Sequence, residues 1–163
     1  MINIAIAEDN SFLASSLIKK IELFEDYKMK FHAYNGIELL EGLKQDSNVH
    51  IIFMDIQMPE MDGIEATRKV LQKYPHIKVI MLTVLDSEQS IYDAIQAGAS
   101  GYLVKESSPA ELKNSITEAI AGGASLSPTI ARKAMAIIKN PNVVQDEEED
   151  FNFFEKYPLT DSI

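Results

Sequence analysis

The sequence predicts an α/β protein built on a doubly wound, five-stranded parallel sheet. Short apolar runs alternate with amphipathic stretches in five rounds, and Gly, Pro, Asn, Asp or Ser marks the boundaries. The runs are apolar at successive positions, which is typical of strands covered on both faces. The 163 residues suffice for one domain with a sizeable core and a C-terminal appendage.

The first three rounds lie in the N-terminal half of the chain. INIAIA (2–7) is the first predicted strand, and Ser11 can cap the helix that follows it. MKFHAY (29–34) is the second strand, and the apolar residues after it recur at helical spacing. VHIIFM (49–54) is the third strand, and its helix begins after Gly63.

The last two rounds complete the sheet. IKVIML (77–82) is the fourth strand, and its helix ends at Gly98, where glycine suits the left-handed position that follows a helix. GYLV (101–104) is the fifth strand, and Pro109 begins a fifth helix that runs to Gly122. This predicts a main domain of residues 1–123.

A sixth helix and an acidic tail are predicted beyond the main domain. Pro128 can begin a helix, and four apolar residues follow on one face: Ile130, Ala134, Ile137 and Ile138. The run DEEED (146–150) repels itself and predicts an extended, solvated linker. We therefore assign residues 124–140 to a linker helix and 141–163 to an acidic linker with the possible start of a truncated DNA-binding domain.

Charge and composition exclude several classes of protein. The chain has 15 basic and 25 acidic side chains and a net charge of -10, which argues against nucleic-acid binding by this polypeptide alone. It has no cysteine, which excludes disulfides and thiolate metal sites. The N-terminus lacks the features of a signal peptide, and no apolar run is long enough to cross a membrane. We expect a soluble, cytoplasmic protein with no membrane contact.

Polar residues follow four of the predicted strands. Glu8 and Asp9 follow the first strand, Asp55 the third, Thr83 the fourth and Lys105 the fifth. The carboxyl ends of parallel strands share one rim, which is the usual ligand site of such sheets. Clustered carboxylates repel each other unless a cation lies among them, and hard oxygen ligands suit Mg²⁺. Lys105 and Thr83 are then placed to meet an anion such as a phosphoryl group.

Each of these residues also has an ordinary structural explanation. An Asp at a strand end is usually a turn residue or a helix cap, and a Lys or Thr there usually faces water. The functional interpretation is favoured because the five residues fall at the ends of four different strands, on the rim where a site is expected.

The motifs on this rim resemble those of the receiver domain of two-component response regulators. They are Glu8-Asp9, DxxMPxxDG at 55–63, Thr83 and GAxGYLxK at 98–105. The likeness covers residues 2–122 and implies the flavodoxin-like receiver fold. It also implies that Asp55 accepts a phosphoryl group from a sensor histidine kinase. Asp9, Asp55 and the main-chain carbonyl of Gln57 would bind Mg²⁺, with Glu8 acting through a bound water.

The same resemblance assigns the remaining site residues. Lys105 would pair with the phosphoryl oxygens, the Thr83 hydroxyl would reach them, and the backbone N–H groups of Gln57 and Val84 would help to cradle them. Tyr102 occupies the aromatic switch position. Its ordinary structural explanation, a half-buried strand tyrosine, is compatible with that role in the resting state. Such a domain catalyses its own phosphorylation and dephosphorylation but is a regulatory domain rather than an enzyme.

Two positions depart from the family pattern. Val84 is β-branched where most receivers have a small residue, which predicts crowding near the phosphoryl group. Glu106 replaces the proline that often follows the lysine, and without proline a cis peptide there costs a few kcal/mol. Gln57 and Leu85 occupy the positions that tend to set the phosphoryl lifetime in this family.

The end of the chain resembles receivers of the NarL/LuxR type. In that subfamily a linker leads to a Leu-Thr pair that opens a helix-turn-helix domain, and Leu159-Thr160 lies where this pair belongs. We expect a receiver that lacks its output domain, forms a homodimer on phosphorylation and contacts DNA only through the missing domain.

Three other functions were weighed against this one. A stand-alone receiver, acting by protein contact or as a phosphate sink, differs only in whether the native chain continues past Ile163. A phosphatase of the haloacid dehalogenase class usually has a second Asp two residues after the nucleophile, where this chain has Gln57. A flavin-binding module would need a phosphate-binding loop after the first strand, where this chain has EDNSF.

Overall fold

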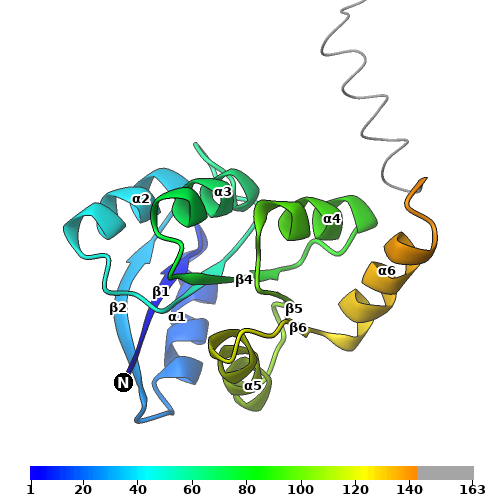
Figure 1. Cartoon of the computed structure of the whole chain (residues 1–163). Coiled ribbons are helices and arrows are strands. Elements are labelled where there is room, and N and C mark those ends of the chain that lie inside the picture. The colour runs from blue at the N-terminus through cyan, green and yellow to red at the C-terminus, as the bar shows by residue number, and fades with distance from the viewer. Residues whose placement is uncertain (143–163) are drawn as a thin grey trace, which may run out of the picture.

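The computed structural model describes residues 1–142 and contains one parallel sheet with helices on both faces (Figure 1). The strands in chain order are β1 (Ile2–Ala7), β2 (Tyr27–Ala33), β3 (Ile51–Met54), β4 (Lys78–Thr83), β5 (Gly101–Val104) and β6 (Ser125–Leu126). Their order across the sheet is β2-β1-β3-β4-β5-β6, and every neighbouring pair is parallel. The doubly wound α/β class is therefore confirmed.

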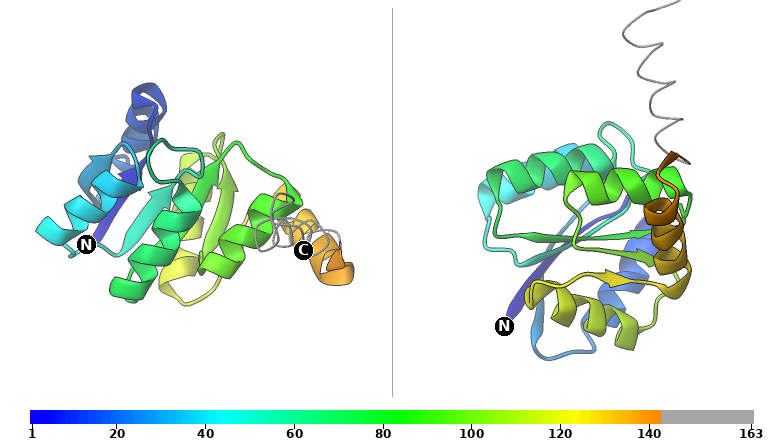
Figure 2. Two further views of the ribbon diagram at one scale, coloured as in Figure 1. Left: turned by 90° about the horizontal axis from the view of Figure 1, so that it is seen from above. Right: turned by 45° about the vertical axis from the view of Figure 1, so that its right-hand side comes forward.

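Helices alternate with the strands as the sequence predicts. They are α1 (Ser11–Ile21), α2 (Gly36–Gln45), α3 (Gly63–Lys73), α4 (Glu88–Ala97), α5 (Pro109–Ile120) and α6 (Pro128–Lys139). Helices α1 and α5 cover one face of the sheet, and α2, α3 and α4 cover the other (Figure 2). No helix within residues 1–142 is long and apolar enough to span a membrane.

Two apolar cores lie on opposite faces of the sheet because successive side chains of a strand point in opposite directions. In β3, Ile52 and Met54 pack toward α2, α3 and α4, whereas Ile51 and Phe53 pack toward α1 and α5. All four side chains are fully buried. This explains why β3 is continuously apolar, with no polar alternation.

Side-chain caps fix where the helices begin. Asn10, rather than the predicted Ser11, caps α1: its backbone is extended, and its side chain accepts the Leu13 N–H at 3.0 Å. Both residue types are good caps, so only the backbone geometry decides between them. Ser108 and Glu111 form a capping box that starts α5 beside Pro109.

The C-terminal part of the described chain extends the sheet by one strand. The prediction of five strands missed β6, a two-residue strand that pairs Ser125 and Leu126 with Gly101 and Tyr102. Helix α6 then packs against α4, with Ile130 among its buried residues. The acidic run 146–150 and the Leu159-Thr160 pair lie outside the described residues.

Candidate functional site

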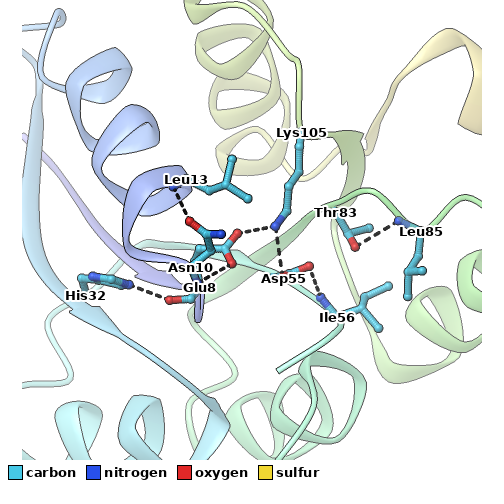
Figure 3. Close-up of polar contacts among 9 residues, drawn as sticks. All are labelled: Glu8, Asn10, Leu13, His32, Asp55, Ile56, Thr83, Leu85 and Lys105. Carbon is cyan, nitrogen blue, oxygen red and sulfur yellow. Dashed lines mark hydrogen bonds and ion pairs between the residues drawn. The ribbon is translucent and has the colours of Figure 1, made fainter. Parts of the chain in front are cut away.

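The winding of the sheet reverses between β1 and β3. From β1 the chain moves outward to β2, and from β3 it moves to the other side through β4 and β5. This arrangement opens a crevice at the carboxyl ends of β1 and β3. Glu8 and Asp9 follow β1 and Asp55 follows β3, so the topology brings the predicted carboxylates to the crevice. Figure 3 shows Glu8 and Asp55 there.

The three carboxylates form a compact cluster. One oxygen from each of Glu8, Asp9 and Asp55 lies within 4.8 Å of the others. Glu8 and Asp55 are each 5% exposed, whereas Asp9 is open to solvent. Oxygens that share an octahedral Mg²⁺ lie about 3 to 4 Å apart, since each is about 2.1 Å from the ion. The cluster therefore fits Mg²⁺ after a small inward movement of its side chains.

Gln57 lies beside this cluster. It lines an open depression together with Asp9, Met58 and Asp62. Asp62 also serves as a helix cap, because its Oδ1 accepts the Glu65 N–H at 2.9 Å at the start of α3. The carboxylate that remains in the depression is Asp9, next to the backbone of Gln57. Both of these residues were predicted at the metal site.

Lys105 reaches into the acidic cluster from the end of β5. Its ammonium group donates to Glu8 Oε1 and lies 3.1 Å from Asp55 Oδ2 (Figure 3). Burial acts to lower the pKa of Lys105, but the hydrogen bond to Glu8 and the charge of Asp55 outweigh it and raise the pKa. Lys105 therefore stays charged at neutral pH.

Glu8 responds differently to the same surroundings. Burial raises the pKa of its carboxyl group, and the hydrogen bonds from Lys105 and from the Asn10 N–H offset this only in part. The ionised form of Glu8 is thus less favourable in the folded protein than in water. One ammonium group does not neutralise three carboxylates, so the cluster keeps a net negative charge when all three are ionised. A divalent cation binds well to such a cluster.

Asp55 is held by its neighbours in a fixed orientation. Its Oδ1 accepts the Ile56 N–H at 2.8 Å, and its Oδ2 faces Lys105. Its own N–H donates to Ala7 O at 3.0 Å and continues the pairing of β3 with β1. A buried carboxylate so oriented beside a cation can act as a nucleophile toward an electrophilic phosphorus.

Gly63 has a closer relationship to Asp55 than the sequence indicated. Asp62 serves as the cap of α3, and Gly63, the first residue of that helix, lies against the backbone of Asp55. A Cβ atom at Gly63 would be 2.0 Å from the Asp55 carbonyl oxygen. The Gly63 N–H donates to Ile56 O at 2.8 Å. Only glycine permits this approach.

Thr83 and Tyr102 contact the backbone of the same residue, Leu85. Thr83 is fully buried, and its Oγ1 accepts the Leu85 N–H at 3.2 Å. The Tyr102 hydroxyl donates to Leu85 O at 2.7 Å. The Tyr102 side chain is 1% exposed and is thus buried more deeply than the half-buried strand tyrosine of the ordinary structural explanation. Burial, followed by the charge of Asp86, raises the pKa of Tyr102, so the phenol keeps its proton and remains a donor.

Two departures from the family pattern can be located. Val84 is 61% exposed, which places most of its side chain in solvent rather than in the buried part of the site. The peptide between Lys105 and Glu106 is trans, as every peptide bond of residues 1–142 is.

Sequence reasoning missed the residues that support the site from other elements. His32, on the edge strand β2, contacts the Glu8 carbonyl through Nε2 at 2.7 Å. Lys20, on α1, donates to Ser107 O at 3.1 Å in the loop after Lys105. No local motif marks these residues, and only the strand order brings them to the site.

Comparisons with known proteins agree with this geometry. The sequence profile of the response regulator receiver domain matches residues 4–117. The uncharacterized transcriptional regulatory protein YxjL of Bacillus subtilis (strain 168) is 32% identical over 135 residues, which are 83% of this chain and 62% of that protein. The transcriptional regulatory protein DegU of Brevibacillus brevis is 30% identical over 148 residues, which are 91% of this chain and 61% of that protein.

The chain spans about three fifths of the length of these two relatives. Among solved structures, it resembles a two-component response regulator of the LuxR family from Aurantimonas sp. SI85-9A1. That likeness has a TM-score of 0.75 at 27% identity and covers 90% of this chain and 96% of the other. The rim residues, the parallel sheet and the profile match agree, and the chain therefore belongs to the response regulator receiver domain family.

Proposed function

We propose that this chain is a phosphorylation-controlled signalling switch in which Asp55 accepts a phosphoryl group from a sensor histidine kinase. The observation that carries the proposal is the position of the buried Asp55 carboxylate, which faces the Lys105 ammonium group and clusters with the carboxylates of Glu8 and Asp9. A buried acid that paired with Lys105 for structural reasons alone would not need two further carboxylates beside it.

The transfer step follows from these groups. An Asp55 carboxylate oxygen attacks the phosphorus of the phosphohistidine, so that a P–O bond forms, the P–N bond breaks and the leaving imidazole nitrogen takes up a proton. Mg²⁺ bound by Asp9, Asp55 and the Gln57 carbonyl, with Glu8 acting through a water, would neutralise charge on the transferring group. Lys105 then pairs with the phosphoryl oxygens, and the N–H groups of Gln57 and Val84 donate to them.

Thr83 and Tyr102 are proposed to carry the signal away from Asp55. The phosphoryl group adds about two negative charges and strong acceptor oxygens. It therefore offers the Thr83 O–H a new acceptor, and the loop containing Leu85 must adjust. The Tyr102 hydroxyl donates a hydrogen bond to the Leu85 carbonyl in that loop, so the contacts of Tyr102 change together with those of Thr83. The surface over residues 86–122 is the part of the domain that we expect to respond.

We further propose that the switch regulates an attached transcriptional output domain. The support is that the named relatives are transcriptional regulatory proteins of which this chain spans about three fifths. In this proposal residues 1–123 form the receiver and 124–140 the linker helix. Residues 141–163 form an acidic linker and, at Leu159-Thr160, the start of the output domain. DNA contact belongs to the output domain, homodimerisation follows phosphorylation, and the protein works in the cytoplasm.

Mass spectrometry of the intact chain tests the acceptor assignment. Incubation with acetyl phosphate and Mg²⁺ should add the mass of one phosphoryl group, and both a chelator and Asp55→Asn should abolish the addition. The matched control is Asp62→Asn, which removes a charge from the neighbouring depression but keeps a side chain that can cap α3. Phosphorylation that persisted in Asp55→Asn would overturn the assignment.

A further inference from the structure

Helix α6 is packed onto the receiver rather than standing apart from it. Its buried residues Ile130, Ala134 and Ile137 belong to the same apolar core as Ile91 of α4 and Tyr102 of β5. Helices α4 and α6 lie side by side (Figures 1 and 2). Helix α6 therefore covers part of the surface that is expected to respond to phosphorylation.

One polar side chain of α6 reaches past this apolar contact. Lys133 donates a hydrogen bond from Nζ to the Asp86 carbonyl at 2.8 Å, and the same nitrogen lies 3.1 Å from Asp86 Oδ2. The hydrogen bond from Lys133 to the Asp86 carbonyl holds the main chain of residue 86. The ion pair alone would hold only the Asp86 side chain, which can rotate away. The Lys133 side chain is 29% exposed, so its stem is largely covered.

Asp86 lies in the short loop between β4 and α4, which begins directly after Thr83. Within this loop the N–H of Leu85 donates to Thr83 Oγ1, and the Leu85 carbonyl accepts from Tyr102. The next carbonyl, that of Asp86, accepts from Lys133. Side chains from β4, β5 and α6 therefore hold two consecutive residues of the loop. A shift of the loop that breaks one of these contacts must strain or break the others.

We propose that Lys133 is a positioning residue that couples the acceptor site to α6 by tying the β4–α4 loop to this helix. The inference rests on the proposed function, since it takes phosphorylation of Asp55 as the input. A change at Thr83 alters the position of the loop, the loop carries Asp86 with it, and the docking of α6 responds. Coupling is reciprocal, so the docking of α6 in turn biases the loop.

The strength expected of this coupling is modest. A partly exposed ion pair with an added hydrogen bond changes an equilibrium by roughly two- to fivefold. A stability measurement alone would not separate such an effect from ordinary packing, because α6 is also held by its apolar residues. The informative quantity is the response of α6 to an event at Asp55.

Hydrogen exchange of the full chain measures that response. Exchange over residues 128–139 is compared with and without beryllium fluoride and Mg²⁺ in the wild type, in Lys133→Met and in Arg132→Met. Methionine keeps an apolar stem of similar length but removes the ammonium group. Arg132 is exposed on the same helix and provides the matched control for a lost positive charge. A thermal melt of each variant verifies that it is folded.

We expect beryllium fluoride to change exchange in α6 by roughly two- to fivefold in the wild type and in Arg132→Met. The change should be lost in Lys133→Met, while acetyl phosphate still adds one phosphoryl group to that variant. An equal response in Lys133→Met, or no response in a wild type that takes up phosphoryl, would overturn the coupling and leave the acceptor assignment intact. A wild type that takes up no phosphoryl group would instead overturn the proposed function, and the coupling with it.

Discussion

The Tyr102 hydroxyl donates a 2.7 Å hydrogen bond to the carbonyl of Leu85. The N–H of the same residue donates to Thr83 Oγ1, so two side chains from neighbouring strands hold one loop residue from its two sides. Both side chains are buried, and a hydrogen bond is electrostatically stronger in such surroundings than in water. Leu85 is therefore the structural link between a hydroxyl at the proposed phosphoryl site and an aromatic ring at the edge of the response surface.

Thr83→Ala should separate phosphorylation from the response of the loop. Asp55 and Lys105 remain in place, so acetyl phosphate should still add one phosphoryl group. Without the hydroxyl, the phosphoryl group has no hydrogen-bond partner on β4, and exchange over residues 83–105 should no longer respond to beryllium fluoride. Thr83→Ser keeps the hydroxyl and should keep the response. Identical exchange in the wild type with and without the mimic would contradict the switch mechanism.

Asp9→Asn should weaken Mg²⁺ binding markedly, by about tenfold or more. The change removes one of the three clustered charges, and the remaining amide oxygen is a weaker ligand for a hard cation. Asp62→Asn is the matched control, because Asp62 lines the same depression but is engaged as the cap of α3. Titration calorimetry would measure both variants. Equal affinities in Asp9→Asn and the wild type would mean that the cluster is not a metal site.

Gly63→Ala should damage the site through the backbone. The new Cβ would meet the Asp55 carbonyl oxygen at 2.0 Å, and a main-chain atom cannot rotate away. We expect a loss of about 3 kcal/mol in the free energy of unfolding, the upper end for overpacking, together with slower phosphorylation. Gly122→Ala provides the contrast: its φ of 87° is strained for alanine, but its Cβ would meet nothing within 4 Å.

That contrasting variant should lose only about 1 kcal/mol and should be phosphorylated at the wild-type rate. Chemical denaturation gives the unfolding free energies, and intact mass gives the rates. Comparable losses in the two variants would show that the close approach of Gly63 to Asp55 is not the constraint at this position.

The sequence predicts the sheet and its helices well because the signals are local. Most strands of the main domain are largely apolar, and a run such as IIFM can be stable only with both faces covered, whereas the edge strand β2 (YKMKFHA) includes polar residues. Strand β6 was missed because two residues, Ser125 and Leu126, carry no periodicity. It forms only because Gly101 lets the chain pass closely: a Cβ there would lie 2.9 Å from the Ser125 carbonyl.

The residues at the strand ends of the candidate site could also be predicted from local signals in the sequence. Parallel strands deliver their carboxyl ends to one rim, so the residues after each strand could be grouped without knowing the strand order. The contacts of Lys133 with Asp86 and of His32 with Glu8 could not be predicted, because they join elements that are distant in sequence. The burial of Tyr102 also depends on tertiary packing, since β6 pairs with β5 and the buried residues of α6 belong to the same core as Tyr102.

Glu8→Gln should stabilise the metal-free protein at neutral pH. Because burial raises the pKa of Glu8, the folded state binds a proton more readily than the unfolded chain does. Stability therefore falls as pH rises from the ordinary carboxyl range through the raised pKa of Glu8, and it stays lower above that pH. Glutamine avoids this loss, since it is uncharged but keeps an oxygen that can accept from Lys105.

The expected signature is a difference that depends on both pH and metal. In chelator, Glu8→Gln should melt about 2 to 5 °C above the wild type at pH 7 to 8, which corresponds to roughly 1 kcal/mol. The two should converge below the ordinary carboxyl range, where Glu8 is protonated in both the folded and the unfolded states. Mg²⁺ should stabilise the wild type more than the variant, because a carboxylate helps to hold the ion and an amide does so poorly. Glu106→Gln, an exposed control, should follow the wild type throughout. A Glu8→Gln protein that was less stable than the wild type in chelator at pH 7 would show that the ion pair with Lys105 outweighs the burial of Glu8.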